Sequence, residues 1–184
     1  MRKSIPILLC VVLIFSLCGC EGLTFEHKTF TQADDYSGIF ELTELRYSEV
    51  AMELFPETVS ELTVCEFYCE WERGIVGSAK VELLLSVQYE AAAFTAETDR
   101  LKALADGKIV YDTQHFQYPA YVSVLGNMNT NYYALVDEEN QTVHYLLLQL
   151  VNAENVDFDQ AYLPAGYGEF GANQELDFNV YYDA

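Results

Sequence analysis

Two stretches of polar–apolar alternation, joined by a short loop with two glycines, constrain the fold of this chain most strongly. Residues 62–73 form the first of these expected strands, with alternation from Cys65 to Glu72, and residues 79–89 alternate again with Leu84 as the exception. A period of two is typical of a β-strand whose faces meet different environments. Because residues 74–77 supply a turn, the sequence predicts an antiparallel hairpin with one buried and one mostly solvated face. In its second strand the buried face is expected to carry Ala79, Val81, Leu83, Leu85, Val87 and Tyr89, and the solvated face Lys80, Glu82, Ser86 and Gln88.

A helix and further strands follow the hairpin. Residues 90–105 contain neither Gly nor Pro. One helical face is expected to carry Ala91, Phe94, Thr98, Leu101 and Ala105. Runs of strands around one helix predict an α+β fold: a mainly antiparallel sheet, in the order strand, strand, helix, strand meander, with one helix packed on one face. The later strands are expected at 109–111, 121–125, 132–137, 142–151 and 176–182, with a turn at 138–141 and with 142–151 central because it is apolar on both faces.

Two cysteines fall within the first predicted strand. Cys65, Phe67, Cys69 and Trp71 recur at every second position. Four strand residues span roughly 13 Å, whereas a disulfide needs Cα atoms within about 7 Å. The pattern therefore predicts two free thiols on one buried face, too far apart to form a disulfide or a metal pair.

The first twenty residues have the layout of an export signal. Arg2 and Lys3 precede a mostly apolar run, which ends in Leu17-Cys18-Gly19-Cys20. This run resembles the lipobox of bacterial lipoproteins, although that family more often has Ala or Ser at the position of Cys18. The resemblance implies that the Cys20 thiol receives a diacylglyceryl group and that the chain is cut just before it. A retained membrane helix is one alternative, but the apolar run is shorter than the roughly 20 residues that a bilayer needs. A signal peptide cut elsewhere is the other alternative.

The lipobox resemblance divides the chain and implies where the protein resides. We expect a signal peptide at 1–19, a lipidated N-terminus and tether at 20–35, and a single globular domain at 36–184. Two acyl chains hold a protein firmly on a membrane. The expected location is therefore the extracytoplasmic face of the cell membrane. The Tyr-rich arrangement behind the lipobox also resembles that of small uncharacterised lipoproteins of Gram-positive bacteria, a likeness that implies no activity.

The charge of the chain is strongly acidic and unevenly distributed. It has 9 Lys and Arg against 29 Asp and Glu, and its net charge of −20 becomes −22 when Arg2 and Lys3 leave with the signal peptide. Residues 109–184 contain no Lys or Arg. Such a surface does not suit nucleic acid or anionic headgroups, which attract basic residues. A charge that keeps an exported domain soluble is the simpler interpretation, and a surface for cations or a basic partner is the alternative.

Two motifs in the C-terminal part are incomplete. Residues 166–171 match G-x-G-x-x-G, but Pro164 precedes them and no βαβ unit surrounds them, so we expect no dinucleotide site. Asn155, Asp157 and Asp159 offer oxygens at alternate positions, as calcium loops do. The glycine and glutamate that an EF-hand needs at its sixth and twelfth positions are missing. An acidic loop is the simpler interpretation, and a looser calcium site stays open.

No pattern identifies a reaction. His27, His115 and His144 are scattered, and neither H-E-x-x-H nor G-x-S-x-G occurs. We therefore assign no catalytic, cofactor-binding or metal-binding residue, and lipidation at Cys20 is the one modification expected. Eight tyrosines of the C-terminal half form either a contact patch or cross-strand pairs: Tyr118, Tyr121, Tyr132, Tyr133, Tyr162, Tyr167, Tyr181 and Tyr182.

The expected function is that of a lipid-anchored binding or accessory protein at the cell envelope. Its expected contacts are the membrane, through Cys20, and a protein or envelope partner of unknown identity, without nucleic acid. An envelope enzyme of unrecognised type and a calcium-dependent surface module are the alternatives.

Overall fold

The computed structural model describes residues 24–39, 42, 53–57, 59, 63–74, 79–105, 109–125 and 130–167. The predicted signal peptide, Cys20 and the predicted strand at 176–182 lie outside these residues. So does the glycine-rich loop beyond Tyr167.

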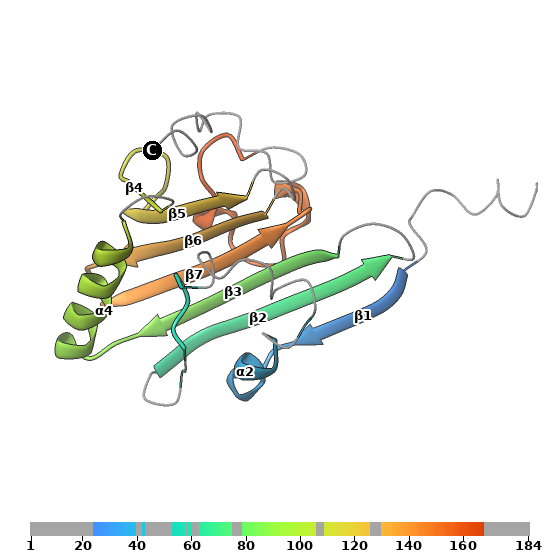
Figure 1. The fold of residues 1–184 in the computed structure, drawn as a ribbon, viewed down its shortest axis with the longest axis horizontal. Helices are drawn as coiled ribbons and strands as arrows, with labels where there is room; N and C mark the ends of the chain where they lie inside the picture. Colours follow the sequence, from blue (N-terminus) through green and yellow to red (C-terminus); the bar gives the residue numbers. More distant parts are fainter. Residues whose placement is uncertain are drawn as a thin grey trace, which may run out of the picture.

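The described residues form a seven-stranded sheet in which all neighbouring strands are antiparallel (Figure 1). The strand order is β1-β2-β3-β7-β6-β5-β4, which places β7 at the centre as its two apolar faces predict. The fold is thus mainly antiparallel sheet, with one helix of fourteen residues, α4. The strands are β1 (Thr24–Phe30), β2 (Thr63–Gly74), β3 (Lys80–Gln88), β4 (Val110–Asp112), β5 (Ala120–Leu125), β6 (Thr130–Asp137) and β7 (Thr142–Gln149). The helical segments are η1 (Ala33–Asp35), α2 (Tyr36–Ile39), α4 (Ala91–Leu104), η3 (Ala153–Asn155) and η4 (Gln160–Tyr162).

The predicted hairpin is the pair β2 and β3. Its inward residues alternate as expected, and the cross-strand pairs Phe67–Leu85, Cys69–Leu83 and Trp71–Val81 lie within one buried cluster. The N-terminal stretch that was expected to be a tether is different. Residues 24–30 form the edge strand β1, which pairs with β2.

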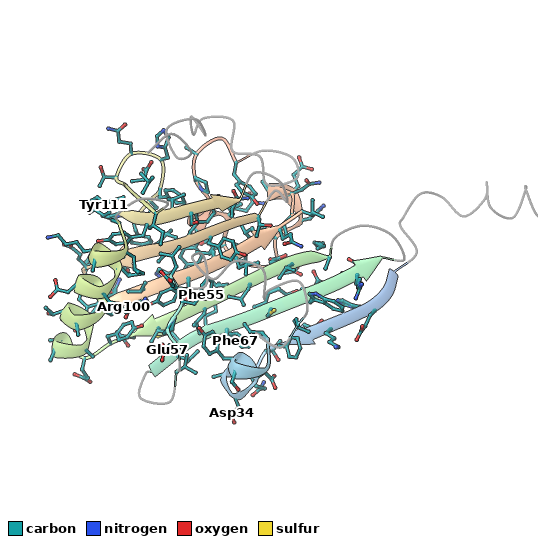
Figure 2. The ribbon with its side chains drawn as sticks, in the orientation of Figure 1. Asp34, Phe55, Glu57, Phe67, Arg100 and Tyr111 are labelled. Carbon is teal, nitrogen blue, oxygen red and sulfur yellow. The ribbon has the colours of Figure 1, made fainter. Side chains whose placement is uncertain are left out.

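The first face of the sheet is covered by α4 and by parts of residues 36–59. Leu101 of α4 is fully buried, and Phe94 packs against the same cluster. Ala91, expected on the inward face, is exposed. The Tyr36 hydroxyl donates to the carbonyl of Pro56 (2.6 Å), and Arg100 of α4 donates to the carbonyl of Leu54 (2.9 Å). These bonds fasten the segment of residues 53–57 over the first face of the sheet. Figure 2 labels Arg100 and, next to it over the sheet, Phe55.

The second face is also covered, which corrects the expectation of a solvated face. The chain leaves β7 through Leu150, whose φ of 55° lies in the left-handed region, and residues 151–167 then pack over this face. As a result Glu82 and Ser86 are 0% and 2% exposed instead of solvated. The residues of this second buried cluster include Leu84, Tyr133, Leu146 and Leu148 from the strands and Val151, Phe158, Leu163 and Tyr167 from the covering segment.

The two thiols of β2 differ in their surroundings. The pairing of β2 with β3 shifts between Val64 and Glu66, as in a β-bulge, so Cys65 has no directly opposed residue. Cys65 is exposed and Cys69 is fully buried, and neither forms a disulfide. The prediction that these two cysteines form no disulfide is confirmed. Burial of Cys65 was wrong, because the extra residue takes it out of the alternation.

Candidate functional site

A pocket of about 330 Å³ opens at one end of the second face. It lies where β2 begins, β3 ends and the β6–β7 turn reverses the chain, and Tyr118 and Tyr162 lie against it from outside the sheet. We call it the tyrosine–histidine pocket. Its walls are Cys65, Glu66, Ser86, Tyr118, Asp137, Asn140, Thr142, His144 and Tyr162.

His144 lies at the centre of this arrangement. Its Nδ1 forms a hydrogen bond with the Ser86 hydroxyl (2.8 Å). Its ring packs at tilted angles against Tyr162 and Tyr118, with centroids 4.5 Å and 5.6 Å away. Its Nε2 is buried and has no hydrogen-bond partner among the described residues. Burial lowers the pKa of His144, and the negative charge of Asp137 opposes that shift only in part. The imidazole is therefore neutral at pH 7, with one ring nitrogen left to pair.

The polar lining of the pocket is acidic or neutral. Asp137 is almost fully buried, and its two oxygens accept from the backbone and side-chain nitrogens of Asn140 (3.1 Å and 2.7 Å). Burial and the charge of Asp137 raise the pKa of the Tyr118 hydroxyl. Glu66 adds a second carboxylate, and no Lys or Arg is among the described residues that line the pocket. None of these described residues offers a positive charge to an anionic ligand.

A second group of polar residues lies on the same face, further along β2 and β3. Glu70 and Glu82 are directly opposed across these strands, and Asp157 of the covering segment joins them. One carboxylate oxygen from each lies within 4.8 Å of the others. We call these three residues the carboxylate cluster. Directly opposed like charges destabilise a strand pair, so this register has a cost.

Glu82 is the buried member of the carboxylate cluster. Its Oε1 accepts a hydrogen bond from the backbone nitrogen of Asp157, and its Oε2 is buried without a partner among the described residues. Burial raises the pKa of Glu82 to about 7, although the bond from Asp157 opposes this. The Tyr68 hydroxyl donates to Asp157 Oδ2 (2.7 Å). Together these bonds hold the covering segment to the sheet.

Two basic side chains approach the cluster from the side of Glu70. Lys80 Nζ donates to Glu70 Oε2 (3.1 Å). His27 of β1 contacts Glu70 Oε1 (2.9 Å) and is charged only when protonated. Within the described residues, three carboxylates therefore face one permanent positive charge.

Only some of the residues singled out in the sequence lie in the tyrosine–histidine pocket or the carboxylate cluster. Of the three oxygen-bearing residues at 155–159, Asp157 alone joins the carboxylate cluster, and Asp159 instead accepts from Ala161 in η4. Of the three histidines, only His144 lines the pocket. The described tyrosines do not form an exposed patch. Tyr121, Tyr132, Tyr133 and Tyr167 are buried, Tyr118 and Tyr162 line the pocket, and Tyr181 and Tyr182 lie outside the described residues.

Sequence reasoning missed Ser86 and Glu82 because the alternation places both on the side expected to be solvated. The one available signal was Leu84, an apolar residue between them on the same face. It indicated that this face, too, meets a covering element.

Comparison with protein-family models, curated proteins and solved structures found no match to this chain. Within the described residues, no helix has both the length and the apolar character needed to cross a bilayer. Functional conclusions therefore rest on the chain's own geometry.

Proposed function

We propose that this protein is a lipid-anchored binding protein of the extracytoplasmic membrane face. In this proposal an α+β domain takes a small ligand in the tyrosine–histidine pocket. The observation that carries the proposal is the Nε2 atom of His144, a buried polar atom in a pocket-lining ring without a partner among the described residues. Leaving a buried polar group unpaired costs about 1–3 kcal/mol, which a ligand with a matching group would recover.

The lining restricts the chemistry of the ligand. With Glu66 and Asp137 present and no Lys or Arg among the described lining residues, a neutral or cationic ligand fits better than an anionic one. Tyrosine rings give large contact areas with polar tips. A hydroxyl group can donate to or accept from His144 Nε2, whichever tautomer the Ser86 bond selects. The pocket therefore favours a small molecule that carries hydroxyl or amino groups.

The same geometry favours binding over catalysis. Ser86 and His144 are hydrogen-bonded as in a nucleophile–base pair. However, Ser86 is 2% exposed, and no described carboxylate bonds to the far nitrogen of His144 to support an imidazolium. Burial also lowers the pKa of His144, which weakens it as a base. An envelope enzyme remains the alternative, and hydrolysis of an ester probe that disappears in Ser86→Ala would favour it.

The pocket is tested with glucosamine, which carries hydroxyl and ammonium groups, and with glucosamine 6-phosphate as its anionic counterpart. Calorimetric titration of the full chain in mild detergent is expected to show binding of glucosamine and at least about tenfold weaker binding of the phosphate, equal to about 1.4 kcal/mol. Tyr162→Ala is expected to weaken binding, whereas Tyr111→Ala changes an exposed tyrosine outside the pocket and serves as the control. Tighter binding of the phosphate, or equal losses in both variants, would contradict the proposal.

The anchor is tested separately. Radiolabelled fatty acid is expected to label the wild-type chain and to leave Cys20→Ser unlabelled. Detergent partitioning should place the labelled protein in the detergent phase. A wild-type chain that takes up no label would remove the anchor from the proposal and leave the pocket untouched.

A further inference from the structure

The carboxylate cluster brings three acidic side chains together outside the tyrosine–histidine pocket. Glu70 and Glu82 face each other across β2 and β3, and Asp157 reaches them from the covering segment. Among the described residues, Lys80 is the one permanently charged base on the cluster, and it is bonded to Glu70 at the more exposed side.

Glu82 gives the observation that points to a ligand. Its side chain is 0% exposed, and its Oε2 has no hydrogen-bond partner among the described residues. A buried carboxylate oxygen is normally paired with a donor or a cation. Of the described charged groups near Glu82, Glu70 and Asp157 carry negative charge, and Lys80 bonds to Glu70 instead.

We propose that Glu70, Glu82 and Asp157 bind a calcium ion. Calcium takes six to eight oxygen ligands in flexible geometry, and carboxylates bind it through one or both oxygens. Three carboxylates supply part of such a shell, and water supplies the rest. Magnesium fits less well, because it demands a smaller, near-octahedral shell and gives up water reluctantly.

The position of the ligands gives the ion a structural role. Two ligands belong to neighbouring strands, and the third belongs to the segment that covers the second face. A bound ion would therefore clamp residues 151–167 to the sheet. Because Lys80 competes for Glu70, we expect an affinity typical of extracellular calcium modules, with a Kd of about 0.1–1 mM.

The experiment uses the full chain in mild detergent, with calcium chloride as the probe and sodium chloride at matched ionic strength. At calcium concentrations about ten times the Kd, we expect the melting temperature to rise by about 3–6 °C beyond the sodium control. Calorimetric titration should show one site, with magnesium binding at least about tenfold more weakly. A melting temperature that responds to calcium no more than to sodium would overturn the proposal.

Variants assign the site to the carboxylate cluster. Glu82→Gln keeps the side-chain shape and an acceptor for the Asp157 N–H, and it should abolish the calcium response. Asp157→Asn changes an exposed residue, so it keeps the test valid if the buried variant does not fold. Glu139→Gln, on the exposed β6–β7 turn, is the matched control and should respond as the wild type does. A full calcium response in both cluster variants would place the ion elsewhere and refute the site.

Discussion

Arg100 of α4 offers the sharpest test of what holds the first face of the sheet together. Its guanidinium donates to both oxygens of Glu97 and to the carbonyls of Glu53 and Leu54. Tyr145 of the central strand donates to the same Glu97 carboxylate. Arg100 and Glu97 together thus join the helix, the segment at Glu53 and Leu54, and the sheet. Glu97 is 11% exposed and Arg100 is 36% exposed.

Replacing Arg100 with Met keeps most of the aliphatic stem and removes the four charged hydrogen bonds. Breaking a buried ion pair from one side costs about 3–5 kcal/mol, because the remaining charge is left uncompensated. Water reaches Arg100 over about a third of its surface, so we expect a smaller loss of about 2–3 kcal/mol of unfolding free energy. For a chain of this length that loss lowers the melting temperature by roughly 5–10 °C.

The assay is equilibrium unfolding in urea, with Lys102→Met as the control because Lys102 is an exposed base on the same helix. Adding Glu97→Gln to Arg100→Met removes the uncompensated charge and should restore about 1 kcal/mol. A loss below about 0.5 kcal/mol in Arg100→Met, or equal losses at Arg100 and Lys102, would refute the view that this network fastens residues 53–57 to the helix and the sheet.

Three further predictions concern thiols, protons and salt. In the native protein a thiol reagent should modify Cys65 quickly and Cys69 only after unfolding, since Cys69 is fully buried and burial raises its pKa to about 12; equal native rates would contradict the bulge. Because burial lowers the pKa of His144, the unfolded chain binds more protons than the folded chain below a pH of about 6.5. The free energy of unfolding should therefore decrease as the pH is lowered through this range, by up to about 1.4 kcal/mol per unit of pKa shift. The difference between wild type and His144→Gln isolates this contribution from that of Glu82, which has the opposite sign; a difference independent of pH would contradict it. Finally, residues 109–184 carry no Lys or Arg, so the melting temperature should rise as sodium chloride increases from about 0.01 M to 0.15 M, and a fall would show that ion pairing outweighs repulsion.

The strands of the hairpin were predictable because each carries its own periodic pattern, whereas residues 24–30, which form β1, were expected to belong to a tether. β2, β3 and the turn before β7 appear at the expected positions since alternation and turn residues are local signals. The central place of β7 also followed, from residues that are apolar on both faces.

The two sites were not predictable, because each depends on contacts between distant residues. Residues 151–167 carry no clear period, so nothing indicated that they would fold back over the second face. The contact between Glu82 and Asp157 joins residues 75 positions apart. Without that cover, Glu82 and Ser86 read as ordinary solvated positions, and the site residues could not be distinguished from surface. The bulge at Cys65 was also missed: one inserted residue shifts the alternation by one position, so Val64 and Phe67 face the same cluster and Cys65 between them does not.

The pairing of β1 with β2 has a consequence for how an anchored protein would be oriented. Thr24, the first residue of β1, is opposite Gly74, whereas the pocket is reached at Glu66, eight positions back along β2. At about 3.3 Å per residue, that separation is close to 26 Å. Cys20 precedes Thr24 by four residues, which span at most about 14 Å when extended. An acylated Cys20 would therefore hold one end of the sheet close to the lipid surface and project the mouth of the pocket outward, toward molecules arriving from the medium.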